Sequence, residues 1–169
     1  PTAKWLSFPE AAQQFGRSLH GQVNLLEEAQ HLMRFRANFA DRPEVHFPRP
    51  IEPYLHPSVI VETFEDAVPL ASFLANPHPA NPRIAHLGLQ CFLQMIFRDG
   101  FVHADLHPGN MRFLSPGRVV LLDLGLVGVL VTDDRLTTAS LLFALATGDG
   151  VAVARSFYDN APHRAVPDY

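Results

Sequence analysis

Apolar side chains recur every three or four residues along several stretches of the chain, a spacing that places them on one face of a helix. Helices are predicted at residues 7–20, 22–39, 81–100, 132–147 and 151–158. Signals at the helix ends agree with these bounds. Ser7 and Glu10 form a capping pattern, Pro82 suits the first turn of a helix, and Gly100 and Gly148 suit helix C-termini.

Short runs of β-branched and apolar residues between these helices predict strands. They lie at residues 45–47, 59–64, 101–102, 111–113 and 119–122, with a turn at residues 115–117. The proline-rich segment 41–57 must otherwise be extended or turning. This order of elements predicts an α+β fold that is predominantly helical. Because few strands are available to cover it, we expect the apolar face of the 22–39 helix to be incompletely buried.

The composition narrows the classes of protein that fit this pattern. Of the 169 residues 47% are hydrophobic, so the chain can bury a core and disorder is not expected. The formal net charge of −4 lacks the basic excess of nucleic-acid-binding proteins, so no nucleic-acid partner is expected. The single cysteine, Cys91, lies in a helical pattern and is predicted to be a small buried residue. Because residue 1 is Pro, we expect a fragment or a processed form.

Two blocks of polar residues carry the candidate chemistry. Residues 103–110 read His-Ala-Asp-Leu-His-Pro-Gly-Asn, and residues 123–125, after an apolar strand, read Asp-Leu-Gly. The protein-kinase motifs H-R-D-L-x-x-x-N and D-F-G have the same spacing. We therefore expect a protein-kinase-like fold in which Asp105 orients or deprotonates the nucleophile. Asn110 and Asp123 would hold Mg²⁺ against the phosphates of a nucleotide.

The two histidines of the first block have different expected roles. His103 is predicted to be structural, packing and hydrogen-bonding the backbone near Asp123. His107 stands where typical kinases often place a lysine near the γ-phosphate, so it would act as a weaker, pH-sensitive counterpart or simply stack. The His-x-Asp-x-His pattern would also fit a metal-hydrolase site, but that alternative leaves Asn110 and Asp123 unexplained.

Parts of an ordinary protein kinase are not found in the sequence. Ala104 replaces the arginine that pairs with an activation-loop phosphate, and a helix start at Thr132 leaves too few residues for a peptide-docking segment. We therefore expect no ordinary protein substrate. Lys4 is the only lysine and no glycine-rich loop is present, so the part of a small lobe that covers the nucleotide is expected to lie outside this chain.

The first block, in its form H-A-D-x-H-P-G-N, together with Asp-Leu-Gly resembles the UbiB/ADCK family of atypical kinases, whose members support coenzyme Q metabolism. Residues 28–29 resemble the family's Glu-Ala helix, which favours Glu28 over Glu27 as the partner of the phosphate-binding lysine. Residues 47–50 and 61–65 resemble its strands four and five and its hinge, which assigns nucleotide contacts to Glu62 and Phe64.

This resemblance implies a small-lobe remnant at residues 1–66 and a kinase-like large lobe at residues 67–169. It implies ATP and Mg²⁺ as cofactors and a role in lipid or coenzyme Q metabolism. A lipid, a quinone-pathway molecule or an enzyme of that pathway would be the partner, with peripheral membrane association. Residues 5–10 lean toward the mitochondrial branch called aarF-domain-containing kinase 2, so a mitochondrial location is expected.

Two alternatives to an atypical kinase or ATPase stay open. One is a catalytically silent kinase-like scaffold that binds lipid or a partner enzyme. The other is a small-molecule phosphotransferase of the aminoglycoside or choline type, which shares the H-x-D-x-x-x-x-N loop.

Overall fold

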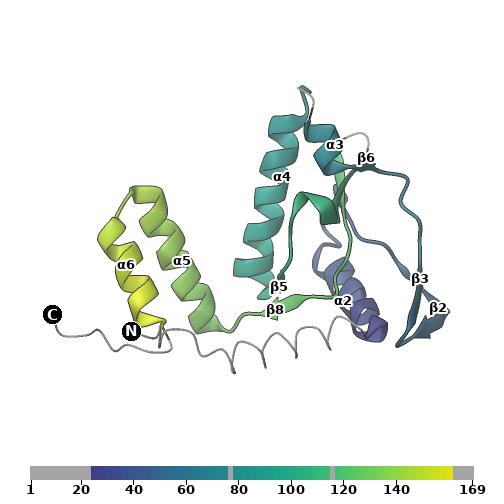
Figure 1. Cartoon of the computed structure of the whole chain (residues 1–169), viewed down its shortest axis with the longest axis horizontal. Coiled ribbons are helices and arrows are strands. Elements are labelled where there is room, and N and C mark those ends of the chain that lie inside the picture. The colour runs from purple at the N-terminus through teal and green to yellow at the C-terminus, as the bar shows by residue number, and fades with distance from the viewer. Residues whose placement is uncertain (1–23, 76–77, 115–116, 162–169) are drawn as a thin grey trace, which may run out of the picture.

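The computed structural model describes residues 24–75, 78–114 and 117–161 (Figure 1). The helix predicted at residues 7–20 lies outside the described residues. In chain order the elements are α2 (Leu25–Asn38), β1 (Val45–His46), β2 (Pro50–His56), β3 (Val59–Glu62), β4 (Val68–Pro69), α3 (Leu70–Leu74), α4 (Asn81–Leu93), a π-helical turn (Gln94–Asp99), β5 (Phe101–His103), a 3₁₀ turn (Pro108–Asn110), β6 (Met111–Leu114), β7 (Arg118–Leu121), β8 (Val127–Val129), α5 (Thr132–Thr147) and α6 (Gly150–Asp159).

A four-stranded sheet with the order β1-β7-β6-β4 forms the centre of the described structure. β6 and β7 form an antiparallel hairpin in which Met111 pairs with Leu121, and β1 runs parallel to β7. The β7 residues Val119, Val120 and Leu121 are fully buried. This central position explains why the segment is a nearly continuous apolar run rather than an alternating one.

Two smaller sheets flank the central one. β2 pairs with β3, and β5 pairs antiparallel with β8, so that His103 lies opposite Val127. The second pairing brings the end of β5 beside the loop that follows β7. Both polar blocks of the sequence therefore emerge from neighbouring strand ends, although they are separated along the chain.

Helix α2 supplies much of the core. Its residues Ala29, Leu32 and Phe35 are buried, and the Phe35 ring packs against the rings of Phe47 and Phe101 with centroid distances of 5.4 and 4.8 Å. Leu25 and Leu26 are only half-buried and Met33 is 48% exposed, so the expectation of an incompletely buried apolar face holds in part: the centre of the face is covered and its edges are not. The rings come from other parts of the chain, and β2 and β3 also contact the helix.

Most of the predicted elements are present with small changes of bounds. The helix predicted at residues 81–100 is α4 continued by the π-helical turn, and it ends at Gly100, whose φ of 57° is left-handed. α5 has the predicted bounds. The prediction missed β2, β4, α3 and β8, because these elements are short or rich in proline and lack a clear period. The division into lobes at residue 66 stays a prediction.

Helices α5 and α6 form an antiparallel pair to one side of α4, beyond β8 (Figure 1). They pack against each other, and only Ala144 of α5 is buried. No helix within the described ranges has the length and apolar character that crossing a membrane requires.

Candidate active site

His103 fixes the start of the loop that carries Asp105. Its ring is buried at the end of β5, where Nδ1 accepts a hydrogen bond from the Asp105 N–H at 3.2 Å. Its Nε2 lies 3.3 Å from the carbonyl oxygen of Leu122 and donates to it. Burial lowers the pKa of His103, so the neutral ring that this pattern needs is favoured. The predicted structural role of His103 is thus confirmed.

Asp105 and His107 lie together in the exposed part of the same loop. His107 Nε2 is 3.7 Å from Asp105 Oδ2, while its Nδ1 accepts a hydrogen bond from the Gly109 N–H at 3.0 Å. A Cβ atom at Gly109 would lie 2.5 Å from His107 Cε1, so any larger residue there would displace this ring. The loop therefore presents a carboxylate and an imidazole side by side.

Asn110 and Asp123 lie at the same end of the β6–β7 hairpin. The Leu122 N–H donates to the Asn110 carbonyl oxygen at 2.9 Å, which ties the two loops together one residue before Asp123. Asn110 Nδ2 donates to the Asp105 carbonyl oxygen at 3.3 Å, which leaves Oδ1 as its atom for binding a cation. Asp123 is exposed, and its φ of 55° is left-handed.

Glu28 reaches this loop from α2. Its Oε1 accepts a hydrogen bond from the Leu124 N–H at 3.2 Å. Burial raises the pKa of Glu28 and the charge of Asp123 raises it further, whereas the Leu124 N–H lowers it. The helix that was expected to supply the ion-pair glutamate therefore contacts the Asp-Leu-Gly loop directly.

Glu62 and Phe64 line a cavity of about 270 Å³ beside the hairpin. The Phe64 side chain is 91% exposed. The pKa of Glu62 is raised, mainly by burial of its carboxylate and then by the negative charges of Glu28 and Glu65. The cavity is lined by Pro48, Glu62, Thr63, Phe64, Glu65, Ala67, Arg112 and Leu122.

Arg112 is a lining residue that the sequence reasoning missed. It lies in the central sheet, where it pairs with Val120 on one side and Pro69 on the other. Its neighbour Met111 is buried. Because successive side chains of a strand point to opposite faces of the sheet, the sequence could have placed Arg112 on the face opposite to Met111.

A model of the ABC1 atypical kinase-like domain matches residues 2–157 of this chain. The chain belongs to the ABC1 atypical kinase-like family. The predicted kinase-like fold and the resemblance to the UbiB family are thereby confirmed, and membership of a kinase-like family implies nucleotide binding in general.

Curated ABC1 relatives share 36–46% of their residues with this chain over the matched parts. A probable serine/threonine-protein kinase of Dictyostelium discoideum is 46% identical over 111 residues, which is 66% of this chain and 16% of the relative. Mitochondrial ABC1 family proteins of Schizosaccharomyces pombe and Saccharomyces cerevisiae are 41% and 36% identical, over 66% and 70% of this chain and 16% and 19% of the relatives. The chain thus spans less than a fifth of the length of these relatives.

A solved structure has the same fold as this ABC1 chain. The complex of Rv3197 with erythromycin from Mycobacterium tuberculosis matches with a TM-score of 0.70 and 15% sequence identity, over 98% of this chain and 43% of that one. At this identity the match shows the fold alone.

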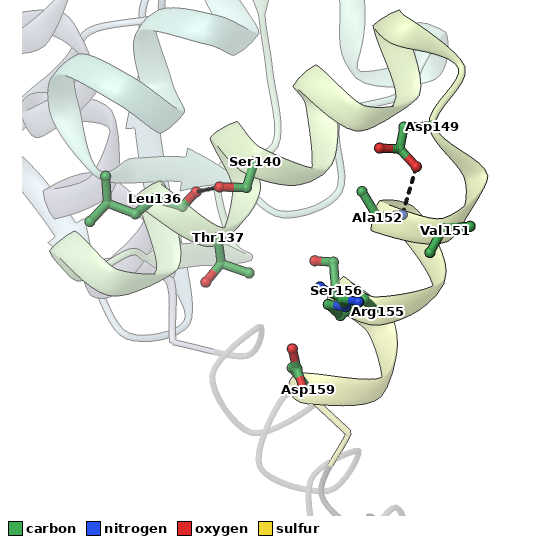
Figure 2. A pocket seen from close by; sticks show the side chains of 9 residues that line it. All are labelled: Leu136, Thr137, Ser140, Asp149, Val151, Ala152, Arg155, Ser156 and Asp159. Atoms are coloured by element: carbon green, nitrogen blue, oxygen red, sulfur yellow. Dashed lines mark hydrogen bonds between the residues drawn. The ribbon is translucent and has the colours of Figure 1, made fainter.

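Another cavity of this ABC1 chain lies between α5 and α6 and contains none of the predicted site residues (Figure 2). Its volume is about 490 Å³. Figure 2 shows that Asp149 and Ser140, two of its polar residues, are engaged within their own helices. Asp149 accepts from the Ala152 N–H at 2.9 Å, and the Ser140 hydroxyl donates to the Leu136 carbonyl oxygen at 3.0 Å. We therefore place the candidate site at the β6–β7 hairpin.

Proposed function

We propose that this chain supplies the catalytic and metal-binding loops of an atypical kinase or ATPase that uses Mg-ATP. The observation that carries the proposal is the hydrogen bond from the Leu122 N–H to the Asn110 carbonyl oxygen, at 2.9 Å. It supports a single site in which Asp105, Asn110 and Asp123 act together, because it joins the two loops that carry them.

Asp105 is the residue proposed to orient the attacking hydroxyl or water. It lies in an exposed loop whose start is fixed by the buried His103 ring. A fixed carboxylate can hold a nucleophile in line with a phosphoryl group, and such positioning supplies much of the rate of phosphoryl transfer. His107, 3.7 Å from Asp105, would add positive charge near the phosphates when it is protonated.

Asn110 and Asp123 are the residues proposed to hold Mg²⁺. Among the described residues no three His, Cys, Asp or Glu side chains gather as a ligand group, so a resident metal held only by such side chains has no support. One carboxylate and one amide oxygen fit Mg²⁺, which keeps several waters and takes phosphate oxygens as further ligands. When bound, the ion would neutralise charge on the nucleotide phosphates.

Glu62 and Phe64 are proposed to contact the nucleotide base. They line the 270 Å³ cavity together with Leu122, the residue before Asp123. A base in this cavity would therefore place its phosphates toward Asn110 and Asp123. Glu28 would pair with a lysine supplied from outside the described residues, because the only lysine of the sequence is Lys4.

The phosphate acceptor is proposed to be a lipid, a quinone-like molecule or water rather than a peptide. Only residues 126–131 separate the Asp-Leu-Gly loop from α5, and three of them form β8. No segment is left there to align a peptide hydroxyl. The mitochondrial ABC1 relatives support a mitochondrial location. From the resemblance to the UbiB family we further propose that the protein is membrane-associated and acts in coenzyme Q or lipid metabolism, in the branch of aarF-domain-containing kinase 2.

The test is phosphate release by the full-length protein with and without lipid vesicles. Asp123→Asn should lower the rate by roughly 100-fold or more, the scale seen when a group that stabilises transition-state charge is removed. His107→Ala should lower it by less than about tenfold, because an exposed charge contributes about 1 kcal/mol or less.

A peptide library assayed beside the vesicles tests the proposed acceptor class. Phosphate release that rises with vesicles, without peptide phosphorylation, is the expected result. Robust, sequence-selective phosphorylation of peptides would contradict it, and would match the name of the Dictyostelium discoideum relative. Equal rates for Asp123→Asn and the unchanged protein would reject the magnesium assignment.

A catalytically silent scaffold is the second candidate. It would be favoured by a full-length protein in which no lysine pairs with Glu28. Calorimetric titration of the full-length protein with Mg-ATP separates the two. Binding with turnover supports the enzyme, whereas lipid binding without nucleotide turnover supports the scaffold.

A further inference from the structure

Two histidines hold the backbone on either side of Asp123. His103 Nε2 lies 3.3 Å from the Leu122 carbonyl oxygen, and His31 Nδ1 lies 2.8 Å from the Leu124 carbonyl oxygen. A carbonyl oxygen only accepts, so Nδ1 of His31 carries a proton and donates it. Each residue next to Asp123 therefore has its carbonyl fixed by an imidazole.

Helix α2 binds both backbone polar groups of Leu124. Glu28 Oε1 accepts from its N–H at 3.2 Å, while His31 donates to its carbonyl. Glu28 and His31 are three positions apart on the helix, so their side chains share one face. The Leu124 side chain is itself fully buried in the core. The helix and the core thus hold this residue at three points.

This support matters because the backbone of Asp123 is left-handed. A φ of 55° is less favourable for aspartate than for glycine, although aspartate adopts it more readily than most residues do, so contacts on either side help to keep it there. The Asp123 side chain is exposed. The held backbone therefore decides where the carboxylate points.

We propose that His31 is a positioning residue of this site. Its hydrogen bond to Leu124 holds Asp123 in the orientation that binds a divalent cation, and it makes cation binding depend on the position of α2. This inference rests on the proposed function, since it takes Asp123 as a cation ligand. The sequence reasoning had identified Glu28 on this helix, whereas His31 is found only from its contact with Leu124.

The donor and the ring of His31 can be tested separately. Its ring lies edge-on to Phe101 with a centroid distance of 5.8 Å. His31→Phe keeps an aromatic ring there and removes the donor. His31→Asn loses the ring but keeps an N–H group close to the position of Nδ1, and asparagine and histidine have similar helix propensity. His86→Phe, at an exposed position on α4, is the matched control for the same substitution elsewhere.

Hydrogen–deuterium exchange of residues 122–126 in the full-length protein, without nucleotide or metal, is the first measurement. His31→Phe should speed exchange there by roughly three- to tenfold, the loss expected for one hydrogen bond. His31→Asn should stay within about twofold of the unchanged protein, because it restores that bond. His86→Phe should leave this segment unchanged.

Titration with Mg²⁺ in the presence of a non-hydrolysable ATP analogue is the second measurement. His31→Phe should raise the Kd for Mg²⁺ by roughly three- to tenfold, and His31→Asn should return the Kd to near the value of the unchanged protein. Unchanged exchange in His31→Phe, or equal exchange in His31→Phe and His31→Asn, would overturn the proposal, since the donor would then have no role.

The two measurements also separate this inference from the proposed function. If exchange responds as expected while even the unchanged protein binds no Mg²⁺ with the analogue, the proposed function fails and the hydrogen bond is purely structural. If the unchanged protein binds Mg²⁺ and His31→Phe binds it equally well, the positioning role alone is rejected.

Discussion

Burial changes the pKa and the reactivity of a side chain, and Cys91 shows this effect clearly. Burial raises the pKa of the Cys91 thiol from 9.0 to about 12. Because thiolate is the reactive form, alkylation by iodoacetamide at pH 8 should be roughly 1,000-fold slower in the native protein than for an ordinary thiol. Mass spectrometry before and after unfolding in urea checks this, and rapid native labelling would contradict the burial.

The same shift predicts a dependence of stability on pH. The unfolded thiol ionises near its ordinary value of 9.0, whereas the folded thiol stays neutral to about 12. The contribution of the neutral thiol to stability is therefore complete below pH 9 and is lost as pH rises from 9 toward 12. The urea-unfolding midpoint of the unchanged protein should therefore fall between pH 8 and 10, and Cys91→Ala should remove the part of this fall that comes from ionisation of the thiol.

At the scale of elements, the end of a helix depends on whether a side chain can fit there. Gly100 ends the helical segment before β5, with a left-handed φ of 57°. A Cβ atom there would lie 2.8 Å from the Leu130 carbonyl oxygen. Gly100→Ala combines strain with a backbone clash and should lower the free energy of unfolding by roughly 2–4 kcal/mol.

Gly148 is the matched control for Gly100. It ends α5 with a similar φ of 72°, but a Cβ atom there would meet nothing within 4 Å. Gly148→Ala should therefore cost only the backbone strain, about 1–2 kcal/mol. Urea unfolding of both variants measures the difference, and equal losses would show that the Leu130 contact is unimportant.

At the scale of the whole molecule, the α5–α6 pair leaves apolar surface uncovered. Phe143, Val151 and Phe157 are 72%, 72% and 66% exposed. A chain of these 169 residues should therefore bind anilinonaphthalene sulfonate and aggregate. Phe143→Ser with Phe157→Ser should reduce both effects, while Tyr54→Ser, an exposed aromatic change on β2, should reduce neither. Dye fluorescence and light scattering test this, and low dye binding by the unchanged chain would contradict it.

The local pattern of the sequence was sufficient to predict the long helices of the described residues and the β6–β7 hairpin that carries the candidate site. The bounds of α5 and the end of the helical segment at Gly100 agree with the structure, because they depend on caps and on periodicity within one segment. β8 was missed because a strand of three residues has too few positions to show a period.

The sequence by itself determined the family and the residue types of the candidate site, because Asp105, Asn110 and Asp123 stand at spacings that specify the kinase motifs. Only the tertiary structure decided what holds them in place. His31 and Leu124 are 93 positions apart, and no local rule relates residues so distant. Their contact exists because α2 and the Asp-Leu-Gly loop pack against one core. For the same reason the burial of Ala29, Leu32 and Phe35 on α2 depends on side chains from distant parts of the chain and not on the pattern of the helix alone.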